Sequence, residues 1–297
     1  MPRTVVVSGA SGLIGSALLS SLRADGVRVR TLVRREPATA DEIRWDPGRQ
    51  PLDPDVLAGA EAVVNLNGAS IGRIPWTPSY LSTLLWSRLS PTRTLATALS
   101  ALGDDAPTLL SASAVGYYGS APGRMLDESA PPGDVFLSTL CVEWENAASA
   151  AGDRVALLRT APIVHPQGVL KPLIALTKAG LGGPIGRGTQ SWPWISLTDE
   201  IRAIRHILDE RMLGPINLVG PSRATANDLG FALALRLNRP YLLRAPTWAV
   251  RAVLGRDMAD SVLTTDAYVV PAALDASGFT FAHPTVEEAV AAVVPAV

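Results

Sequence analysis

The stretch Gly9-Ala10-Ser11-Gly12-Leu13-Ile14-Gly15 decides the fold of this 297-residue chain. It follows a short apolar run, Val5–Val7, which is typical of a buried strand. It then opens a segment in which Ile14, Leu18 and Leu22 recur at helical spacing. A glycine-rich turn between a strand and a helix is typical of the pyrophosphate site in dinucleotide-binding α/β folds.

Each glycine of this turn has a predicted role. Gly9 permits the tight turn, Gly12 lets the backbone approach a pyrophosphate, and Gly15 allows the helix to pack closely on the strand. The free N–H groups at the start of the helix favour an anion there. The chain has no Gly-Lys pair after a glycine-rich loop, so nucleotide hydrolysis at a P-loop gains no support. The residues predicted to bind a dinucleotide are Gly9, Ser11, Gly12, Leu13 and Ile14.

Short apolar runs alternate with longer segments of helical period in the first half of the chain. This alternation predicts the α/β class, with a Rossmann-type doubly wound parallel sheet that helices cover on both faces. Such sheets bind ligands at the carboxyl ends of their strands. The predicted strands are Val5–Val7, Val27–Val33, Ala62–Leu66, Thr108–Ser111 and Val155–Leu158. The predicted helices among them include Leu13–Leu22, Thr92–Leu102 and Leu137–Ala148.

The pattern changes after about Pro162, where glycine and proline become more frequent. We predict an NADP-binding Rossmann domain at residues 1–162 and a smaller C-terminal α/β region, mainly substrate-binding, at residues 163–297. Residues 195–220 are expected to return to the first domain. A small helical module is expected from about residue 246 onward.

Helix start signals support this division. Thr198 is expected to begin a helix over residues 199–211. Thr225 is expected to begin a helix over residues 227–237, through a capping box with the acidic residue three places on. Thr285 opens the last predicted helix in the same way.

Composition excludes several classes of function. The formal net charge is −1, so no general attraction to nucleic acid is indicated. The single cysteine, Cys141, excludes an internal disulfide and is typical of a reducing compartment. No apolar stretch reaches the roughly 18 residues of a membrane span, and the histidines lack the spacing of metal ligands. We therefore expect a cytoplasmic protein without a nucleic-acid, membrane or metal partner.

Two arginines follow the second predicted strand, where the adenosine ribose of a dinucleotide is held. An acidic residue at this place binds the ribose hydroxyls of NAD, whereas a basic residue suits the 2′-phosphate of NADP. Arg34 and Arg35 therefore favour NADP(H) as the cofactor. Glu36 follows at once, and a strand ending one residue later would place an acidic group there instead.

The wider set of motifs resembles the extended and atypical short-chain dehydrogenase/reductases. It is most similar to their epimerase-family proteins (the YfcH-like or SDR39U1-like group), which carry a small C-terminal module. The matching residues are Gly9–Gly15, Trp45–Pro47, Val63–Gly68, Ile71, Trp76-Thr77, Ser87-Arg88, Ser111–Gly119, Trp144-Glu145, Leu158–Thr160, Gly180–Gly186, Gln190, Trp194-Ile195, Gly214–Asn217, Arg239-Pro240, Leu254-Gly255, Pro271 and Gly278-Phe279.

The resemblance implies further cofactor contacts at Asn65, Leu66, Asn67 and Gly68, which take the place of the family's Asn-Leu-Ala-Gly at a strand end. Asn67 replaces a small alanine, so the fit near the ribose or pyrophosphate is expected to differ. Arg88, in the family's Ser-Arg motif, is expected to reach a phosphate or the substrate. The alternative interpretation of Arg88 is a solvated charge on a helix, with no contact to a ligand. Extended members dimerise through two helices, so a monomer and a homodimer both stay open.

Catalysis in the family depends on a Tyr-x-x-x-Lys pair and a serine, which move a proton and orient the reacting oxygen. Ser113 takes the serine place in this resemblance, whereas Phe136 and Leu140 take the tyrosine and lysine places. Neither of the latter two can move a proton. We therefore name Ser113 and Tyr117 as candidate catalytic residues. Strand capping for the serine and simple packing for the tyrosine remain alternatives.

Two functions are consistent with these patterns. The favoured hypothesis is an enzyme: an NADP-binding oxidoreductase or epimerase-like protein that acts on a small carbonyl- or hydroxyl-bearing substrate. The alternative is a non-catalytic NADP(H)-binding sensor or scaffold. The missing Tyr-Lys pair motivates that alternative.

Overall fold

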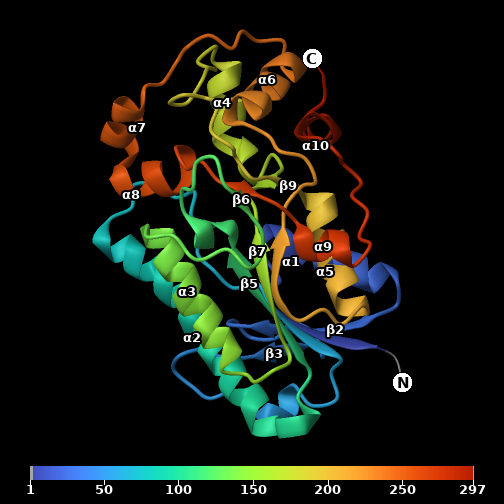
Figure 1. Cartoon of the computed structure of the whole chain (residues 1–297). Helices are drawn as coiled ribbons and strands as arrows, with labels where there is room; N and C mark the ends of the chain where they lie inside the picture. The colour runs from blue at the N-terminus through green and yellow to red at the C-terminus, as the bar shows by residue number, and fades with distance from the viewer. Residues whose placement is uncertain (1–2, 297) are drawn as a thin grey trace.

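A seven-stranded parallel sheet with helices on both faces forms the centre of the molecule (Figure 1). The computed structural model describes residues 3–296. The strand order is β10-β7-β5-β4-β1-β2-β3, which confirms the predicted Rossmann-type α/β fold. The strands are β1 Thr4–Ser8, β2 Arg28–Val33, β3 Glu42–Arg44, β4 Ala62–Asn65, β5 Thr108–Ala114, β7 Val155–Thr160 and β10 Gly214–Leu218.

The direction of winding reverses between β1 and β4. From β1 the chain continues outward to β2 and β3, and from β4 it continues the other way to β5, β7 and β10. Asn65 pairs in register with Ser8 on one side and with Ser111 on the other. The carboxyl ends of β1 and β4 therefore lie side by side at the switch point, where doubly wound sheets bind ligands.

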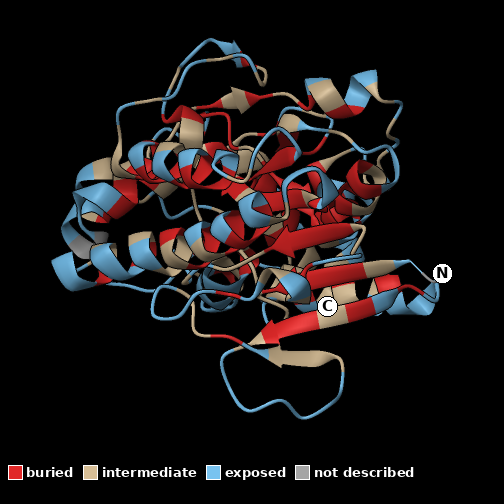
Figure 2. Ribbon diagram, turned by 90° about the horizontal axis from the view of Figure 1, so that it is seen from below, coloured by how far each residue is buried: buried red, intermediate tan, exposed pale blue. Residues whose placement is uncertain are grey.

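Helices cover both faces of the sheet because the side chains of its strands are apolar on both sides. Helices α2 (Pro78–Leu102) and α3 (Phe136–Ser149) pack on one face, and α1 (Leu13–Ala24) and α5 (Leu197–Asp209) pack on the other (Figure 1). Figure 2 shows the central strands buried between these layers, whereas the edge strand β3 is only partly covered. The other helices are α4 Leu170–Lys178, α6 Ala226–Arg236, α7 Thr247–Leu254, α8 Arg256–Met258, α9 Ala272–Ala276 and α10 Val286–Val293. Shorter helical turns are η1 Pro54–Val56, η2 Gly103–Asp105, η3 Val115–Tyr118 and η4 Ala259–Leu263.

A separate hydrophobic core joins α4, α6 and α10 at one end of the molecule (Figure 1). Trp192 and Trp194 are buried in it, and their indole N–H groups donate to the carbonyls of Val262 and Ser222, at 2.9 and 3.1 Å. Two small parallel ladders lie beside this core. They pair β8 Ile163–Val164 with β9 Ile195–Ser196, and β6 Met125–Leu126 with β11 Tyr268–Val269.

Helix α2 is longer than the sequence predicted. The expected helix began at Thr92, but the observed helix begins at Pro78 and passes through Pro91, although proline usually ends a helix. Thr77 caps it by accepting from the backbone N–H of Tyr80 at 3.2 Å. Leu84 lies before the proline and is fully buried, as are residues beyond it. This burial on both sides of the proline outweighs one lost backbone hydrogen bond.

Two further predictions of local structure were incomplete. The edge strand β3 was not predicted because it is only three residues long and carries charged residues at both ends. The helix expected after Thr198 begins earlier, because Ser196 is the N-cap and accepts from the backbone N–H of Asp199 at 3.0 Å. By contrast, the capping box at Thr225 is confirmed, and so is the cap at Thr285.

Candidate functional site

The glycine-rich turn lies at the switch point, between the carboxyl end of β1 and the start of α1. Gly9 has φ 78°, and a Cβ there would lie 2.5 Å from the backbone of Leu66. A Cβ on Gly15 would lie 2.4 Å from the carbonyl oxygen of Gly9. The fold itself therefore requires both of these glycines.

Gly12 differs from the other two glycines of the turn, Gly9 and Gly15. Its N–H donates to the Gly9 carbonyl at 3.1 Å, and a Cβ on Gly12 would come no closer than 3.4 Å to that oxygen. The protein thus leaves open the space that a side chain at this position would fill. Such a cradle at the N-terminus of a helix fits a pyrophosphate, to which the first turn of α1 presents free N–H groups.

Polar side chains join the strand ends beside this turn. The Asn65 amide donates to the Thr92 hydroxyl at 2.7 Å, and its oxygen accepts from the Asn67 amide at 2.8 Å. Asn67 also donates to the hydroxyl of Ser8 at 2.7 Å, and the N–H of Leu66 donates to the Ser8 carbonyl at 3.0 Å. These bonds fix the segment 65–67 against β1. The side-chain amides of Asn65 and Asn67 therefore make most of their hydrogen bonds within the protein.

The two arginines after β2 have different surroundings. Arg35 forms a bidentate ion pair with Glu42, at 2.6 and 2.7 Å, and this bonding lowers the pKa of Glu42 to about 2. Glu36 forms an ion pair with Arg44. Arg34 is exposed and makes no ion pair with any residue in the range 3–296. Arg34 is therefore the free cation after β2, because the carboxylates of Glu36 and Glu42 are already paired with other arginines.

Arg88 is half-buried beside Gly68, on which a Cβ would lie 3.0 Å from the guanidinium carbon. Its guanidinium donates to the carbonyls of Leu84 and Ala69, at 2.9 and 3.1 Å, and lies 5.1 Å from the ring of Trp144. Burial lowers the pKa of Arg88. No carboxylate in the described chain pairs with it, so its positive charge is uncompensated. The solvated-charge alternative is wrong because the guanidinium is held in place by two carbonyls.

A buried ion pair that the sequence did not reveal lies on the α3 side of β5 and β7. Arg159 donates two hydrogen bonds to the Glu145 carboxylate, both at 2.8 Å. The two side chains are only 4% and 9% exposed. The Ser113 hydroxyl donates to the same carboxylate at 2.6 Å. The structure thus places Ser113 in this ion-pair network, with its hydroxyl proton directed to Glu145.

Two adjacent tyrosines in η3 contact the same arginine. The Tyr118 hydroxyl accepts from Arg159 at 2.9 Å and donates to Asn217 at 2.7 Å, and burial raises the pKa of Tyr118 to about 12. The guanidinium carbon of Arg159 lies 3.6 Å from the centre of the Tyr117 ring. The Tyr117 hydroxyl makes no hydrogen bond within the described part of the chain. Tyr117 therefore keeps a free phenol group at the carboxyl end of β5.

Comparison with known proteins agrees with this geometry. The NAD dependent epimerase/dehydratase family matches residues 5–219, which include the glycine-rich turn and all of the central sheet except its first residue. The chain belongs to this family. A domain of unknown function (DUF1731) matches residues 245–293, the part of the chain predicted as a small C-terminal module.

Relatives of this epimerase-family chain cover nearly its whole length. An epimerase family protein of Mycobacterium bovis is 41% identical over 290 residues, covering 96% of this chain and 95% of its own. The human epimerase family protein SDR39U1 is 33% identical over 287 residues, covering 94% and 96%. These relatives confirm the resemblance to atypical, SDR39U1-like short-chain dehydrogenase/reductases.

Solved structures extend the similarity to three dimensions. Human SDR39U1 with NADPH has a TM-score of 0.86 and 30% identity, covering 98% of this chain and 99% of that one. A nucleoside-diphosphate sugar epimerase from Corynebacterium glutamicum has a TM-score of 0.78 and 32% identity, although the similarity covers only 58% of that chain. A nicotinamide dinucleotide is thus the cofactor class of the family to which this chain belongs.

The two positions at which the family has its catalytic tyrosine and lysine carry no proton-transfer group in this chain. Phe136 begins α3 and packs edge-on against Trp76, with ring centroids 6.0 Å apart. Leu140, one turn later, is buried. Among residues 3–296, no cluster of acidic, histidine or cysteine side chains fits a metal ion, and no helix has the length and apolar character needed to cross a membrane.

Proposed function

We propose that this chain is an NADP(H)-dependent oxidoreductase or epimerase-like enzyme that acts on a small carbonyl- or hydroxyl-bearing substrate. Tyr117 exchanges the proton in place of the family's Tyr-Lys pair. The observation that carries this proposal is the guanidinium of Arg159, 3.6 Å from the Tyr117 ring, beside a phenol group without a partner in the described chain.

The glycine-rich turn supports the cofactor part of the proposal. Gly9, Ser11, Gly12, Leu13 and Ile14 hold the pyrophosphate, and the open space at Gly12 admits it. Arg34 binds the 2′-phosphate, whereas the charge of Arg35 is compensated by its ion pair with Glu42. The bound nicotinamide supplies a hydride donor or acceptor. The backbone of Asn65, Leu66, Asn67 and Gly68 lies beside the glycine-rich turn, and Arg88 adds an uncompensated positive charge next to Gly68.

The contacts around Tyr117 support its role in proton transfer. The Arg159 guanidinium lies against the face of the Tyr117 ring and fixes its position, while the phenol oxygen stays free to bond to a substrate. Glu145 holds Arg159 in place through two hydrogen bonds, and Ser113 donates to the same carboxylate. In this arrangement Ser113 acts through Glu145 as a positioning residue.

The test of this function is turnover by Tyr117→Phe. We expect wild-type protein to consume NADPH, followed by absorbance, with at least one member of a panel of ketones, aldehydes and nucleotide sugars. Tyr117→Phe should lower the rate about 10²-fold or more, because general acid–base catalysis contributes at least that much. Binding of NADPH should be unchanged. Tyr241→Phe is the matched control, because its hydroxyl bonds to Asn227 in the α6 region.

Two outcomes would contradict the proposal. Tight NADPH binding without turnover across the panel would favour the sensor or scaffold function. Turnover that survives Tyr117→Phe would remove Tyr117 from the mechanism.

The glycine-rich turn offers a sharper test of cofactor binding. Gly12→Ala should leave the melting temperature nearly unchanged, because the added Cβ meets nothing closer than 3.4 Å. It should nevertheless weaken NADPH binding at least tenfold, since the methyl group fills the proposed pyrophosphate space. Gly15→Ala should instead destabilise the unliganded protein by about 1–3 kcal/mol, through a 2.4 Å clash with the Gly9 carbonyl. Equal melting temperatures for the two variants would show that this assignment of roles is wrong.

Cofactor selectivity depends on Arg34. Arg34→Ala should weaken NADPH binding about tenfold to a hundredfold and leave NADH binding nearly unchanged, since a hydrogen bond to a charged group is worth about 1.5–3 kcal/mol. Titration calorimetry with both cofactors measures this difference. Arg23→Ala is the control, because Arg23 is exposed in the last turn of α1, at the end of that helix away from the glycine-rich turn. An equal loss for both cofactors would refute NADP selectivity through Arg34.

A further inference from the structure

An exposed apolar and basic surface lies on the segment that joins α6 to α7. We define the α6–α7 surface by six residues: Leu235, Arg239, Leu242, Leu243, Arg244 and Trp248. Leu235 is 82% exposed, Leu242 78% and Trp248 73%, and no other large apolar side chain in the described chain is as exposed as these three. Figure 1 shows this segment running over the outer end of the molecule, across α4 and away from the central sheet.

Contacts of residues 241–243 hold the middle of this segment against the rest of the molecule. The N–H groups of Leu242 and Leu243 both donate to the Gly182 carbonyl, at 2.9 and 3.1 Å. Tyr241, the preceding residue, packs its ring 4.4 Å from that of Phe231 on α6. The leucines are therefore held outward by a fixed backbone, although their apolar side chains gain nothing from facing water.

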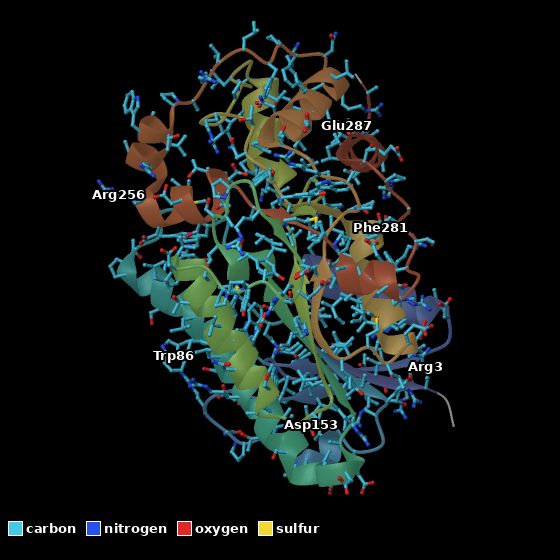
Figure 3. All side chains as sticks on the ribbon, in the orientation of Figure 1. Arg3, Trp86, Asp153, Arg256, Phe281 and Glu287 are labelled. Atoms are coloured by element: carbon cyan, nitrogen blue, oxygen red, sulfur yellow. The ribbon has the colours of Figure 1, made fainter. Side chains whose placement is uncertain are left out.

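The charge of this segment is one-sided. Residues 229–256 contain five arginines and no aspartate or glutamate, whereas the whole chain has a net charge of −1. Arg251 pairs with Asp260, and Arg236 donates to the Val294 carbonyl. Of the described residues, none forms an ion pair with the other three, which are Arg239, Arg244 and Arg256. Figure 3 shows Arg256 at the start of α8, where Asp257 follows it, so the free cations nearest the apolar residues along the chain are Arg239 and Arg244.

We propose that the α6–α7 surface docks the protein on a membrane that contains anionic lipid. Free arginines surrounding exposed leucine and tryptophan side chains are the composition that binds the interface of such membranes. The tryptophan suits this depth because its ring is apolar and its N–H is polar. A second copy of this chain fits less well, because pairing the surface with itself would bring like charges together.

Such docking needs no spanning segment. The apolar side chains enter the headgroup region, and the arginines lie among lipid phosphates and carboxylates. The expectation from the sequence that no membrane is a partner rested on the lack of a membrane span, and surface contact is independent of that feature. Because the attraction is partly electrostatic, binding falls as salt rises.

The experiment is flotation of the full chain with vesicles. One set contains phosphatidylcholine alone, and the other contains phosphatidylcholine with phosphatidylserine. We expect the protein to float with the second set and to stay in solution with the first. Arg239→Gln with Arg244→Gln should lower the partition coefficient about thirtyfold, since each arginine near an anionic surface contributes about fivefold. Leu242→Ser with Trp248→Ser should abolish flotation.

Matched controls distinguish binding through this surface from nonspecific binding of the protein to vesicles. Trp86→Ser and Arg23→Gln alter an exposed tryptophan and an exposed arginine elsewhere, and both variants should float as well as wild type. Figure 3 shows Trp86 on α2, in the opposite half of the view from α6. Circular dichroism checks that every variant is folded, as expected for substitutions of exposed side chains.

Three results would overturn the proposal. The first is no flotation with phosphatidylserine vesicles. The second is flotation that the surface variants leave unchanged. The third is a wild-type dimer in solution that Leu242→Ser with Trp248→Ser converts to a monomer, which would show that the surface joins two copies of the chain.

Discussion

Replacing Glu145 by glutamine should lower the free energy of unfolding by about 3–5 kcal/mol, because it leaves a buried arginine without its counter-charge. Arg159 is 4% exposed, so solvent cannot compensate for the lost carboxylate. The substitution also replaces one carboxylate oxygen by an NH2 group, which cannot accept a hydrogen bond from Arg159, while the remaining oxygen can still accept from Ser113. Denaturant unfolding followed by circular dichroism measures the change.

Two variants show whether the charge itself causes this loss. Glu143→Gln alters an exposed carboxylate on the same helix, α3, and should change stability by no more than about 0.5 kcal/mol. Combining Glu145→Gln with Arg159→Met should recover part of the lost stability, because no buried charge is then unpaired. A loss below 1 kcal/mol in Glu145→Gln would mean that water reaches this pair.

Much of the fold was predictable because the strands and turns carry local signals. The strand before Gly9 has the apolar centre Val5–Val7, and the glycine spacing defines the turn that follows it. Residues 78–91 were not predicted as helix, because Pro91 and several polar residues obscure the helical pattern. The burial of Leu84 in the folded protein stabilises the helix over residues 78–91, and this tertiary contact cannot be predicted from sequence periodicity.

The candidate site was predictable from the sequence only in the part whose residues all come from one continuous segment. Gly9 and Gly15 make the close backbone contacts expected of them, whereas the pyrophosphate role of Gly12 stays a prediction. The network around Arg159 joins residues up to 99 positions apart in sequence, since Tyr118 bonds to Asn217, and no local pattern shows such contacts. One signal was available in the sequence: a glutamate and an arginine stand at apolar-face positions of α3 and β7.

Glu200 should make this protein less stable as the pH rises from 5 to 8. Its side chain is fully buried in the first turn of α5, and burial raises its pKa from 4.5 to about 8. The Thr160 hydroxyl donates to one carboxylate oxygen at 2.9 Å, and the other oxygen has no partner in the described chain. The start of a helix favours a negative charge by at most about 2 kcal/mol. The shift to about 8 corresponds to roughly 4–5 kcal/mol, so burial outweighs the helix.

The direction of the pH effect depends on which state binds the proton. In the unfolded chain this carboxyl ionises near pH 4.5, whereas in the folded protein it stays neutral until about pH 8. The folded state therefore holds one extra proton between these values, and the free energy of unfolding falls by up to ~1.4 kcal/mol for each pH unit. The stabilisation is complete below pH 4.5 and is lost as the pH passes 8.

Glu200→Gln tests this directly because an amide cannot ionise. The variant should have nearly the stability of wild type at pH 5 and should exceed it by several kcal/mol at pH 8.5. Denaturant unfolding at a series of pH values gives the difference between the two proteins, in which the contribution of the other titrating groups cancels. Glu210→Gln, at the exposed end of the same helix, should show no such dependence. A constant difference between Glu200→Gln and wild type from pH 5 to 8.5 would show that Glu200 is already ionised in the folded protein.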